Sequence, residues 1–529
     1  MAILNSKIYL AKNIKLDSNY KNVLSYSEST MLDLVIANSI ASSNTYQFIR
    51  ERNSIHVDFS YAECVESNYI AYQNPDYSNK WFFAFIDEVN YKSNKSTEIK
   101  FTIDVWSTWY GKWSAKDCMI IREHVNDDTL GKHTVPENLE TGEFITQYDS
   151  TDLSYGKFYV CVGISEDVLK ETSGVPDNKK YNGVVSGLTY IIVKEDSFNN
   201  FIFRYNELGK IDSIVSIFMV PENFASPIVW ITDETGLINF KYVEEKSTPY
   251  SLGSVEIRKP AILGEVDDSY TPKNNKMLTF PYVYLVGTNN AGADVVYKYE
   301  DFGIVEGIPS NYIKFETVGS ISAGCSIKCV PIKYKQHDGR NYLESFNGAK
   351  LPLGGWINDV YANWLRQNGL NVGLNVVGSV AGMVGSVSTG QVLGAVLTGL
   401  NIGNTVASVY QQSLVPNQAE GNINSSDIMF SAGKISPSFY QMTIKTEYAK
   451  IIDKFLSRFG YLVNITKNPN LTGRPFWNYI KLGDGEDMCL GQIPTNYSKI
   501  INKIGQTGTT IWHNHENIGN FDLDNSLNN

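Results

Sequence analysis

Cysteine is scarce in this sequence and widely spaced, with six residues in 529 positions, at 64, 118, 161, 325, 329 and 489. That distribution excludes a disulfide framework and a paired zinc knuckle. Cys325 and Cys329 lie four residues apart in a strand-like run and so share one sheet face, but no second pair or nearby histidine completes a metal shell. We therefore expect a reduced chain that holds no metal and no other cofactor.

Positive charge is also in short supply, because 45 Lys and Arg stand against 56 Asp and Glu, a net charge of −11. Affinity for nucleic acid comes largely from clustered Lys and Arg, so tight DNA binding is not expected. The first residues, Met1 to Lys7, lack a charged region followed by an apolar stretch. We therefore expect no secretion signal and a chain that folds in the cytoplasm.

Aromatic residues are plentiful, with 33 Tyr and 24 Phe in a chain that is 43% hydrophobic. A chain of this length and composition can bury a large core divided among two to four domains. Short alternating runs at 56–61, 80–86 and 98–106 are separated by polar turn residues, which is typical of antiparallel strands. The sequence therefore predicts a mainly β fold.

Changes in pattern along the chain predict four parts. Residues 1–125 form an N-terminal β domain, 126–346 an inserted β-rich domain with longer polar loops, 347–437 a long uncharged loop, and 438–529 a C-terminal part that completes the first domain. One helix is expected from Met442 to Phe459, because apolar residues recur there at helical spacing: Ile444, Tyr448, Ile451, Ile452 and Phe455.

Charge is absent altogether from one stretch, since no Asp, Glu, Lys or Arg occurs between Arg366 and Glu420 in a chain that is 19% charged. Glycine recurs there, and four Gly-x-x-x-Gly pairs place small residues on one helical stripe, as membrane helices do where they pack closely. The glycine and apolar residues that we assign to a membrane-inserting loop are Gly369, Leu370, Val372, Gly373, Leu374, Val376, Val377, Gly378, Val380, Ala381, Gly382, Met383, Val384, Gly385, Gly390, Val392, Leu393, Gly394, Val396, Leu397, Gly399, Leu400, Ile402 and Gly403.

This stretch lacks a clean run of about 20 apolar residues, so it is not a permanent transmembrane helix. Its glycines also weaken any helix that stands alone in water. Composition leaves three interpretations open: a conditionally membrane-active loop, a buried Gly-rich helical hairpin, or a linker without fixed structure.

Separate blocks at both ends of the chain share one resemblance. They read YIAYQNPDYSNKWFFAF (69–85), FTIDVW (101–106), IREHVNDD (121–128), FGY (459–461), KNPNL (467–471), FWNY (476–479) and IWHNHENIGN (511–520). In these blocks and their order, with the Gly-rich stretch between them, the sequence resembles the tail knob, or distal tail tube, protein of small podophages of picovirus type. These phages have protein-primed genomes and infect Gram-positive bacteria. The middle region, 131–346, resembles the family in its strand-rich character.

The resemblance implies a virion protein at the phage tail tip, assembled in the host cytoplasm, with a multi-domain β-barrel or β-sandwich tail-tube architecture. It implies a homohexamer that contacts other tail proteins, namely the lower collar or connector and a tail-tip component. Six uncharged loops would close the lumen and then enter the host cytoplasmic membrane. Genomic DNA would pass through without specific binding, which fits the acidic composition.

Candidate chemistry is sparse, and no catalytic residue is proposed. His513, His515 and Glu516 could ligate a metal on one side of a strand, although a structural turn around Trp512 is favoured. His124 could act as a general base, but an interface or turn role is favoured.

Two further patterns have a structural explanation that we favour. Asp484-Gly485-Glu486-Asp487 is much shorter than a calcium loop and fits a solvated turn. The aromatic residues Trp81, Phe82, Phe83, Trp106, Trp109 and Trp113 could stack on glycans, but core packing is favoured. The alternatives to a tail tube are a receptor-binding or cell-wall-binding tail component and a secreted β-rich pore-forming toxin.

Overall fold

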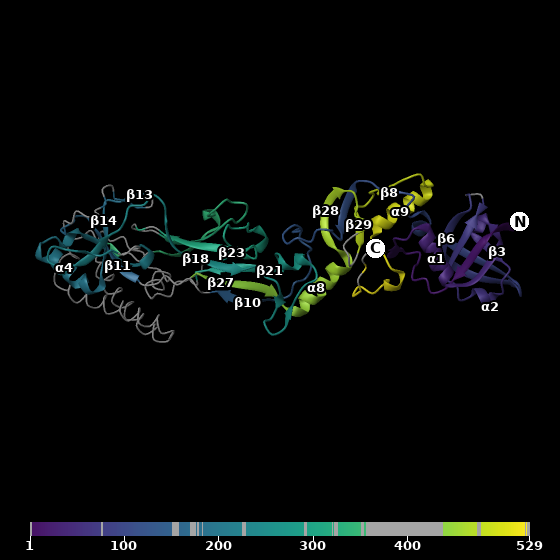
Figure 1. Cartoon of the computed structure of the whole chain (residues 1–529), viewed down its shortest axis with the longest axis horizontal. Helices are drawn as coiled ribbons and strands as arrows, with labels where there is room; N and C mark the ends of the chain where they lie inside the picture. Colours follow the sequence, from purple (N-terminus) through teal and green to yellow (C-terminus); the bar gives the residue numbers. More distant parts are fainter. Residues whose placement is uncertain are drawn as a thin grey trace, which may run out of the picture. The chain divides into compact units, whose positions relative to one another are not determined.

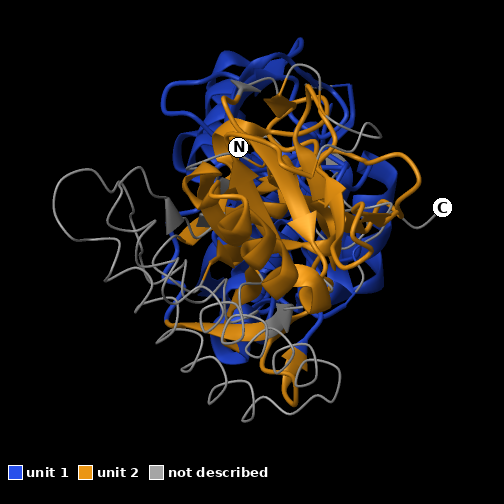
Figure 2. Ribbon diagram, turned by 90° about the vertical axis from the view of Figure 1, so that its left-hand side faces the viewer, with its two compact units in different colours: residues 1–142, 270–281, 446–529 blue, residues 143–269, 282–445 orange. Residues whose placement is uncertain are grey.

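The structure is a computed structural model, and it describes residues 3–75, 78–150, 158–169, 176, 179–181, 184–224, 229–289, 294–319, 321, 326–350, 354–355, 437–472, 478–523 and 525 (Figure 1). The chain divides into two compact units (Figure 2). Unit 1 contains Met1–Gly142, Tyr270–Pro281 and Thr446–Asn529, and unit 2 contains Glu143–Ser269 and Tyr282–Lys445. The four-part division expected from the sequence stays a prediction.

Unit 1 contains a closed barrel with the strand order β1-β3-β4-β7-β6-β5. Its strands are β1 (Ile3–Ala11), β3 (Ser39–Ile49), β4 (Ser54–Val57), β5 (Tyr69–Asn74), β6 (Lys80–Ser93) and β7 (Ser96–Ile103). Neighbours pair antiparallel, and β1 closes the barrel on β5 from Ile8↔Tyr72 to Ala11↔Tyr69. The abundance of aromatic and β-branched residues fits these strands, and the predicted mainly β fold is confirmed.

The barrel interior is filled by side chains. Residues directly opposite in the register share one face, and this rule places one residue set inward from all six strands: Ile8, Leu10, Phe48, Ile55, Ile70, Tyr72, Phe82, Ala84, Ile99 and Phe101. The Tyr72 ring lies 5.6 Å from the Phe82 ring and 5.4 Å from the Phe101 ring, measured between centroids. A single copy of this barrel is therefore a packed core and not a pore.

A second sheet in unit 1 joins the two ends of the chain, in the order β2-β31-β29-β9-β28. Its strands are β2 (Asn22–Leu24), β31 (Thr509–Trp512), β29 (Tyr479–Leu482), β9 (Cys118–Glu123) and β28 (Tyr461–Lys467). β2 pairs parallel to β31, so an N-terminal strand lies beside a C-terminal one. A short pair, β8 (Ser114–Ala115) with β30 (Cys489–Leu490), lies in the same unit.

The helices of unit 1 are α1 (Glu28–Ala37), α2 (Tyr61–Cys64), α3 (Val105–Trp109), α8 (Thr446–Phe459) and α9 (Thr495–Thr507). The Ser27 hydroxyl caps α1 by accepting the N–H of Thr30, and Asp104 caps α3 by accepting the N–H of Ser107. The outer face of β1, β5 and β6 packs on α1 and on Trp512, which is fully buried. Residues from both chain ends thus share one core.

Unit 2 is a layered β structure. Its six-stranded sheet has the order β16-β17-β14-β11-β15-β26, formed by β16 (Ile231–Thr232), β17 (Asn239–Tyr242), β14 (Thr189–Val193), β11 (Phe158–Ile164), β15 (Ile214–Pro221) and β26 (Gly354–Gly355). A four-stranded sheet contains β18 (Tyr250–Arg258), β23 (Tyr312–Gly319), β24 (Ser326–Pro331) and β25 (Phe346–Lys350). Short pairs are formed by β12 (Lys180–Tyr181) with β13 (Val184–Val185) and by β19 (Leu263–Gly264) with β20 (Ser269–Tyr270).

Both faces of the six-stranded sheet are covered, and the period of two explains how. On β11, Val160 and Val162 face a core that contains α4 (Phe198–Glu207), whereas Cys161 faces a core shared with β18 and β24. Such two-sided burial makes β11 and β14 almost continuously apolar.

A third sheet of unit 2 has the order β10-β27-β21-β22. Its strands are β10 (Phe144–Ser150), β27 (Ser438–Ile444), β21 (Val283–Thr288) and β22 (Asp294–Tyr297). β27 is a central strand, because it pairs with β10 on one edge and β21 on the other. This sheet therefore holds the chain immediately after the uncharged stretch.

Two expectations about the C-terminal part were wrong in detail. The helix predicted from Met442 begins at Thr446, because the residues up to Ile444 continue β27. Its apolar stripe is also rotated, since Ile451 is 67% exposed while Asp453 is buried with its carboxylate satisfied. A second helix, α9, also follows, where only one helix was expected beside the terminal strands, and its Ile501 and Ile504 are buried.

Candidate functional site

The predicted membrane-inserting residues, Gly369 to Gly403, all lie in 356–436, outside the described residues. Their role stays a prediction. The structure describes the chain on either side of them, where β25 and β26 come before the stretch and β27 follows it.

Two phenyl rings, one on each side of residues 356–436, meet inside unit 2. Phe346, which precedes the stretch, and Phe439, which follows it, have ring centroids 6.0 Å apart. Phe439 also lies 4.5 Å from the ring of Phe315. All three side chains are buried, and aromatic pairs at such distances contribute about 0.5 to 1.5 kcal/mol beyond their buried area. We call Phe315, Phe346 and Phe439 the loop stem, because Phe346 and Phe439 lie on strands that come before and after residues 356–436.

The register of β27 fixes the loop stem further. Phe439 lies opposite Ser150 on β10 and opposite Gly287 on β21. A Cβ at Gly287 would lie 2.8 Å from the Phe346 ring, so a side chain there would push the ring away. Glycine at this position thus allows Phe346 to close over the sheet.

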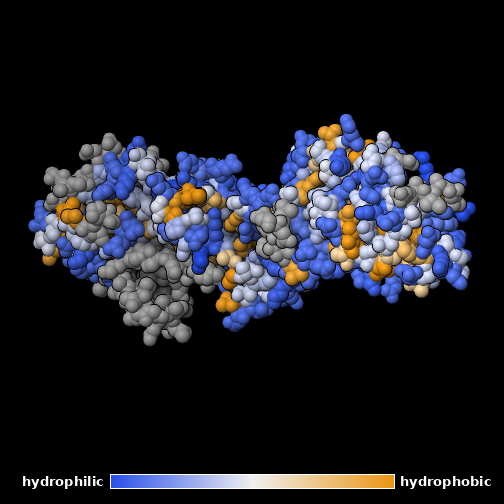
Figure 3. All heavy atoms as spheres, turned by 45° about the vertical axis from the view of Figure 1, so that its right-hand side comes forward, coloured by the Kyte–Doolittle hydropathy of each residue, from blue (hydrophilic) through white to orange (hydrophobic). Residues whose placement is uncertain are grey.

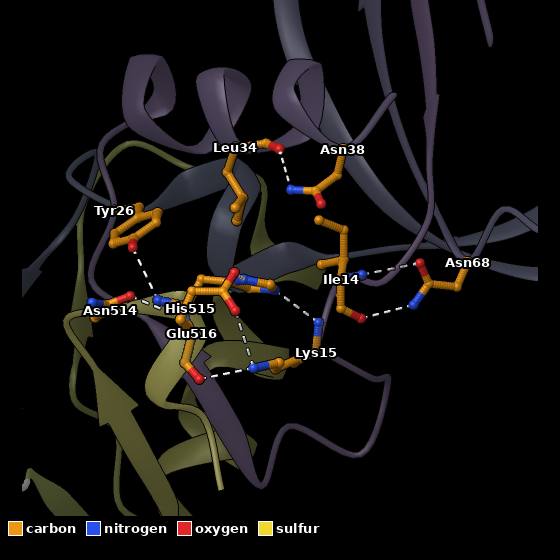
Figure 4. Close-up of polar contacts among 9 residues, drawn as sticks. All are labelled: Ile14, Lys15, Tyr26, Leu34, Asn38, Asn68, Asn514, His515 and Glu516. Carbon is orange, nitrogen blue, oxygen red and sulfur yellow. Dashed lines mark hydrogen bonds and ion pairs between the residues drawn. The ribbon is translucent and has the colours of Figure 1, made fainter. Parts of the chain in front are cut away.

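The chain ends of unit 1 meet in a partly buried polar junction (Figure 4). The backbone N–H of Lys15 donates to Nε2 of His515 at 3.0 Å, and the N–H of His515 donates to the hydroxyl of Tyr26 at 3.0 Å. On the other side of the same segment, the Asn68 amide bonds both the N–H and the carbonyl of Ile14. Asn68 and His515 therefore hold residues 14–15 between the barrel and the C-terminal turn.

The two histidines considered as metal ligands, His513 and His515, use all their ring nitrogens for hydrogen bonds. His513 Nδ1 lies 2.5 Å from the Ser25 hydroxyl, and its Nε2 lies 3.2 Å from the carbonyl of Thr472. His515 Nδ1 lies 3.1 Å from the Glu516 carboxylate. Burial lowers the pKa of both imidazoles below the ordinary value. Their geometry is that of a structural turn next to Trp512.

His124, considered as a general base, is fully buried and also hydrogen-bonded at both ring nitrogens. Its Nδ1 accepts the backbone N–H of Tyr479 at 2.7 Å, and its Nε2 lies 2.8 Å from the carbonyl of Ser457. It joins the end of β9 to β29 and α8. Gly460, at φ +67°, follows α8, and a Cβ there would lie 2.3 Å from the Glu123 carbonyl, so the close approach requires glycine.

The short acidic motif at 484–487 forms part of a hydrogen-bonded turn. Glu486 accepts the N–H of Met119 at 3.0 Å, and Asp487 accepts the Asn502 side-chain amide at 2.7 Å. Gly485 has φ +79°. Two of its carboxylates are therefore occupied by protein donors.

Buried carboxylates anchor residues 270–281, the short segment that returns to unit 1 between two parts of unit 2. Asp453 on α8 accepts four hydrogen bonds: from the Tyr270 hydroxyl at 2.7 Å, from the Lys273 N–H at 2.8 Å, and from the Asn274 N–H and side-chain amide at 3.1 and 2.8 Å. Four donors satisfy a carboxylate well enough to offset its removal from water.

Glu137 provides a second anchor for the same segment. Its buried carboxylate pairs with Arg122 and Lys276 and accepts the N–H of Leu462 at 2.9 Å. Burial lowers the pKa of Lys276, and the nearby carboxylate opposes that shift. Sequence reasoning missed both anchors, because a buried acidic residue has no local signature, whether it lies on a helix, as Asp453 does, or outside regular structure, as Glu137 does.

The aromatic residues weighed as a glycan surface mostly pack inside unit 1. Phe83 and Trp106 are fully buried, and the Trp106 indole N–H donates to the Leu24 carbonyl at 2.9 Å. Trp109 is 8% exposed, and its ring lies 5.8 Å from that of Tyr497. On the face drawn in Figure 3, hydrophobic residues lie in several separate groups among hydrophilic ones.

The described residues contain neither a membrane-spanning helix nor a cluster of metal ligands. No helix there is long and apolar enough to cross a bilayer. Among the same residues, no three His, Cys, Asp or Glu side chains gather as metal ligands. Cys329 is buried in β24, whereas Cys325 lies outside the described residues.

The barrel and the arrangement of sheets match those of known tail proteins. Residues 4–114, which contain the barrel, match the family described as the caudoviral major tail protein N-terminus. The solved structure of the bacteriophage C1 tail knob protein, gp12, superposes with a TM-score of 0.64 at 14% identity, covering 97% of this chain and 98% of the other. At that identity the likeness concerns the fold. Both the family match and the structural likeness are to proteins of bacteriophage tails.

Sequence comparisons identify the family. Residues 240–526, more than half of the chain, match the C-terminal domain of the Bacillus phage phi29 tail knob protein gp9. The gp9 tail knob proteins of Bacillus phages PZA and phi29 are 26% and 25% identical, each over 91% of both chains. That of phage B103 is 24% identical over 89% of this chain and 88% of its own. The chain belongs to the gp9 tail knob protein family.

Membership confirms the resemblance predicted from the sequence. Tail knob proteins are structural components of the virion, located at the phage tail, where they contact other tail proteins. The family is structural and indicates no catalytic function.

Proposed function

We propose that six copies of this chain form a hollow tube at the tip of the phage tail, through which the genome leaves. The Gly-rich segments first close the lumen of the tube. They then enter the host cytoplasmic membrane and form a channel.

The loop stem carries this proposal. Residues 356–436 are tied to unit 2 at both ends, because β25 before them and β27 after them are paired strands, and the rings of Phe346 and Phe439 lie 6.0 Å apart. A segment tied in this way can change its surroundings while the fold that holds it stays intact. β27 supports this anchoring, since its hydrogen bonds to two neighbouring strands would all have to break before the stem could slide.

The packed barrel supports an assembly of several copies. Aromatic rings fill its interior, so DNA cannot pass through one chain. A conduit must therefore lie between copies. Cyclic arrangements close when each copy meets the next through the same pair of surfaces.

The uncharged stretch has the length that a membrane hairpin needs. One helix that crosses a bilayer takes about 20 residues, and two passes take about 40. Residues 367–419 contain no Asp, Glu, Lys or Arg and exceed that length. Inside a tube such a stretch would be hidden from water, which explains apolar sequence in a structural virion protein.

The acidic composition supports transit of DNA without binding. Each chain has a net charge of −11, so a ring of copies repels the phosphate backbone on average. Contacts with a collar or connector and with a tail-tip component complete the proposed setting.

Oligomeric state is the first test of the proposal. Native mass spectrometry of the purified full chain should give a species of six copies, and negative-stain images should show a ring with a central hole. A stable monomer or dimer at the concentrations of the assay would contradict the tube.

Membrane activity is the second test. The assembled protein should release dye from anionic liposomes, and deletion of 367–419, which leaves the loop stem in place, should abolish the release. The double substitution Val380→Asp with Val396→Asp should also abolish it, because each charge costs about 2.5 to 3.5 kcal/mol at the centre of a membrane helix. Val380→Leu with Val396→Leu is the matched control. Equal leakage from all four proteins would rule out insertion of this stretch.

A further inference from the structure

Two buried histidines of unit 1 accept hydrogen bonds from backbone N–H groups at the opposite end of the chain. His515, near the C-terminus, accepts the N–H of Lys15 at 3.0 Å. His124, in the N-terminal part, accepts the N–H of Tyr479 at 2.7 Å. Each bond thus joins segments that lie hundreds of residues apart in sequence.

The opposite ring nitrogen fixes the protonation state of each histidine. His515 Nδ1 donates to the Glu516 carboxylate, and His124 Nε2 donates to the Ser457 carbonyl, so these two nitrogens carry the proton. A backbone N–H cannot turn into an acceptor. A second proton on either ring would therefore place two donors against each other inside the protein.

His513 differs although it lies two residues from His515. Its Nδ1 faces the hydroxyl of Ser25, which can reverse and accept a proton from the ring. The same hydroxyl lies 3.3 Å from the Trp512 carbonyl and can donate there instead. His513 can thus become charged without losing its partner, whereas His515 and His124 cannot.

The charged groups around these rings do not remove the repulsion between two donors that a second ring proton would create. Glu516 favours the protonated form of His515, and Lys15 opposes it, while burial lowers its pKa overall. The Lys15 ammonium lies 3.3 Å from the Glu516 carboxylate and competes for it. Near His124, Glu123 of the same strand is paired with Lys467 on β28, Arg458 on α8 stacks over the Phe459 ring, and β29 contributes the phenol of Tyr479.

We propose that His515 and His124 make the junction of the chain ends in unit 1 acid-labile. When the pH falls, proton uptake by these rings separates residues 14–15 from the C-terminal turn and β29 from the end of β9. The barrel interior and unit 2 use no such bond in the residues described above and stay closed. The proposal is independent of the tube and of the membrane-inserting loop.

The direction of the pH dependence follows from the linkage between proton binding and opening of the junction. A folded-state pKa below the ordinary value of 6.5 means that the open state binds more protons between the two values. Stabilisation is therefore complete above about pH 6.5 and is lost as the pH falls toward the folded-state pKa. In that window the contact of His515 with residues 14–15 opens about tenfold more often per unit of pH.

Hydrogen exchange of the full-length protein between pH 7.5 and 5, corrected for intrinsic rates, tests the proposal. Peptides covering 13–17 and 509–523 should lose protection in acid by about tenfold per unit of pH below the ordinary histidine pKa, while peptides of β5 and β6 keep theirs. His515→Gln places an amide oxygen where Nε2 accepts and does not titrate, so it should remove most of this loss at 13–17. His337→Gln, at an exposed position in unit 2, is the control and should leave it unchanged.

Equal loss in His515→Gln and wild type, or no loss in wild type, would overturn the assignment to His515. If His515→Gln fails to fold, an NMR titration of the histidine ring resonances in the wild-type protein tests the proposal instead. A His515 that titrates at or above the ordinary pKa, with the junction still protected, excludes the proposal.

Discussion

Unit 1 and unit 2 both bring together segments that are far apart in sequence, but the contacts differ in kind. In unit 1, buried imidazoles and carboxylates such as Asp453 join the chain ends and the returning segment 270–281. In unit 2, phenyl rings join β25, which comes before the long uncharged stretch, to β27, which comes after it. Polar junctions are directional and respond to pH, whereas aromatic contacts respond to lost volume. The two units should therefore fail under different perturbations.

Truncating the loop stem should have the largest effect. Phe439→Ala removes a ring that is 1% exposed and should lower the free energy of unfolding of unit 2 by about 3 to 5 kcal/mol, equally at pH 5 and pH 8. Denaturant unfolding measures it. Phe203→Ala on α4, where the ring is 54% exposed, is the control and should stay within about 0.5 kcal/mol of wild type. A strongly pH-dependent loss for Phe439→Ala would erase the contrast between the units.

Removing the anchor of segment 270–281 should have the next largest effect, in unit 1. Asp453→Asn keeps the shape but sets an amide donor against donors that the carboxylate accepted, and should cost about 1.5 to 3 kcal/mol. Limited proteolysis should show earlier cleavage within 270–281. Asp33→Asn, on the exposed side of α1, serves as the comparison and should leave cleavage unchanged. Cleavage that starts in unit 2 instead would show that Asp453 does not hold this segment.

A buried carboxylate in the barrel should give a smaller effect, confined to acid. The pKa of Glu98 is lowered from its ordinary value of 4.5 to about 2, and the hydrogen bond from Lys92 is the largest cause. Because the folded-state pKa is the lower one, the stabilisation is complete above pH 4.5 and declines as the pH falls toward 2. The unfolding free energy of wild type should therefore drop more steeply over this range than that of Glu98→Gln. If the unfolding free energies of the two proteins fall equally over this pH range, Glu98 adds no acid sensitivity.

An exposed ion pair should give the smallest effect. Glu66→Gln removes the 2.9 Å contact with Lys12, a pair in unit 1 with both side chains exposed, and should lower the free energy of unfolding by less than any of the variants above. Raising the salt concentration should shrink the difference from wild type, because exposed charges are screened. A loss as large as that of Asp453→Asn would show that burial does not separate the two classes of charge in this unit.

The strand-rich architecture and the turns between its strands could be predicted from the sequence. The run at 80–86 lies within β6, and the run at 98–106 begins within β7. β7 nevertheless ends at Ile103, because the Asp104 side chain caps α3 and turns the chain into a helix. Local side-chain capping of this kind overrides the alternating pattern.

The meeting of distant segments could not be read from the sequence. Phe346 and Phe439 flank the uncharged stretch, but nothing in their neighbours shows that the rings face each other. His515 was correctly placed in a turn near Trp512, yet its partner is a backbone N–H at Lys15, which has no residue type to recognise. A hydrogen bond between a side chain and a backbone N–H 500 positions away depends on the register of whole sheets.

The chain passes between its two units four times, after residues 142, 269, 281 and 445. A single proteolytic nick at any one of these crossings leaves the units covalently linked through the other three. Tension applied between the units is likewise shared among the four connections of the chain. A particle that carries this protein through mechanical stress therefore does not depend on one peptide linker.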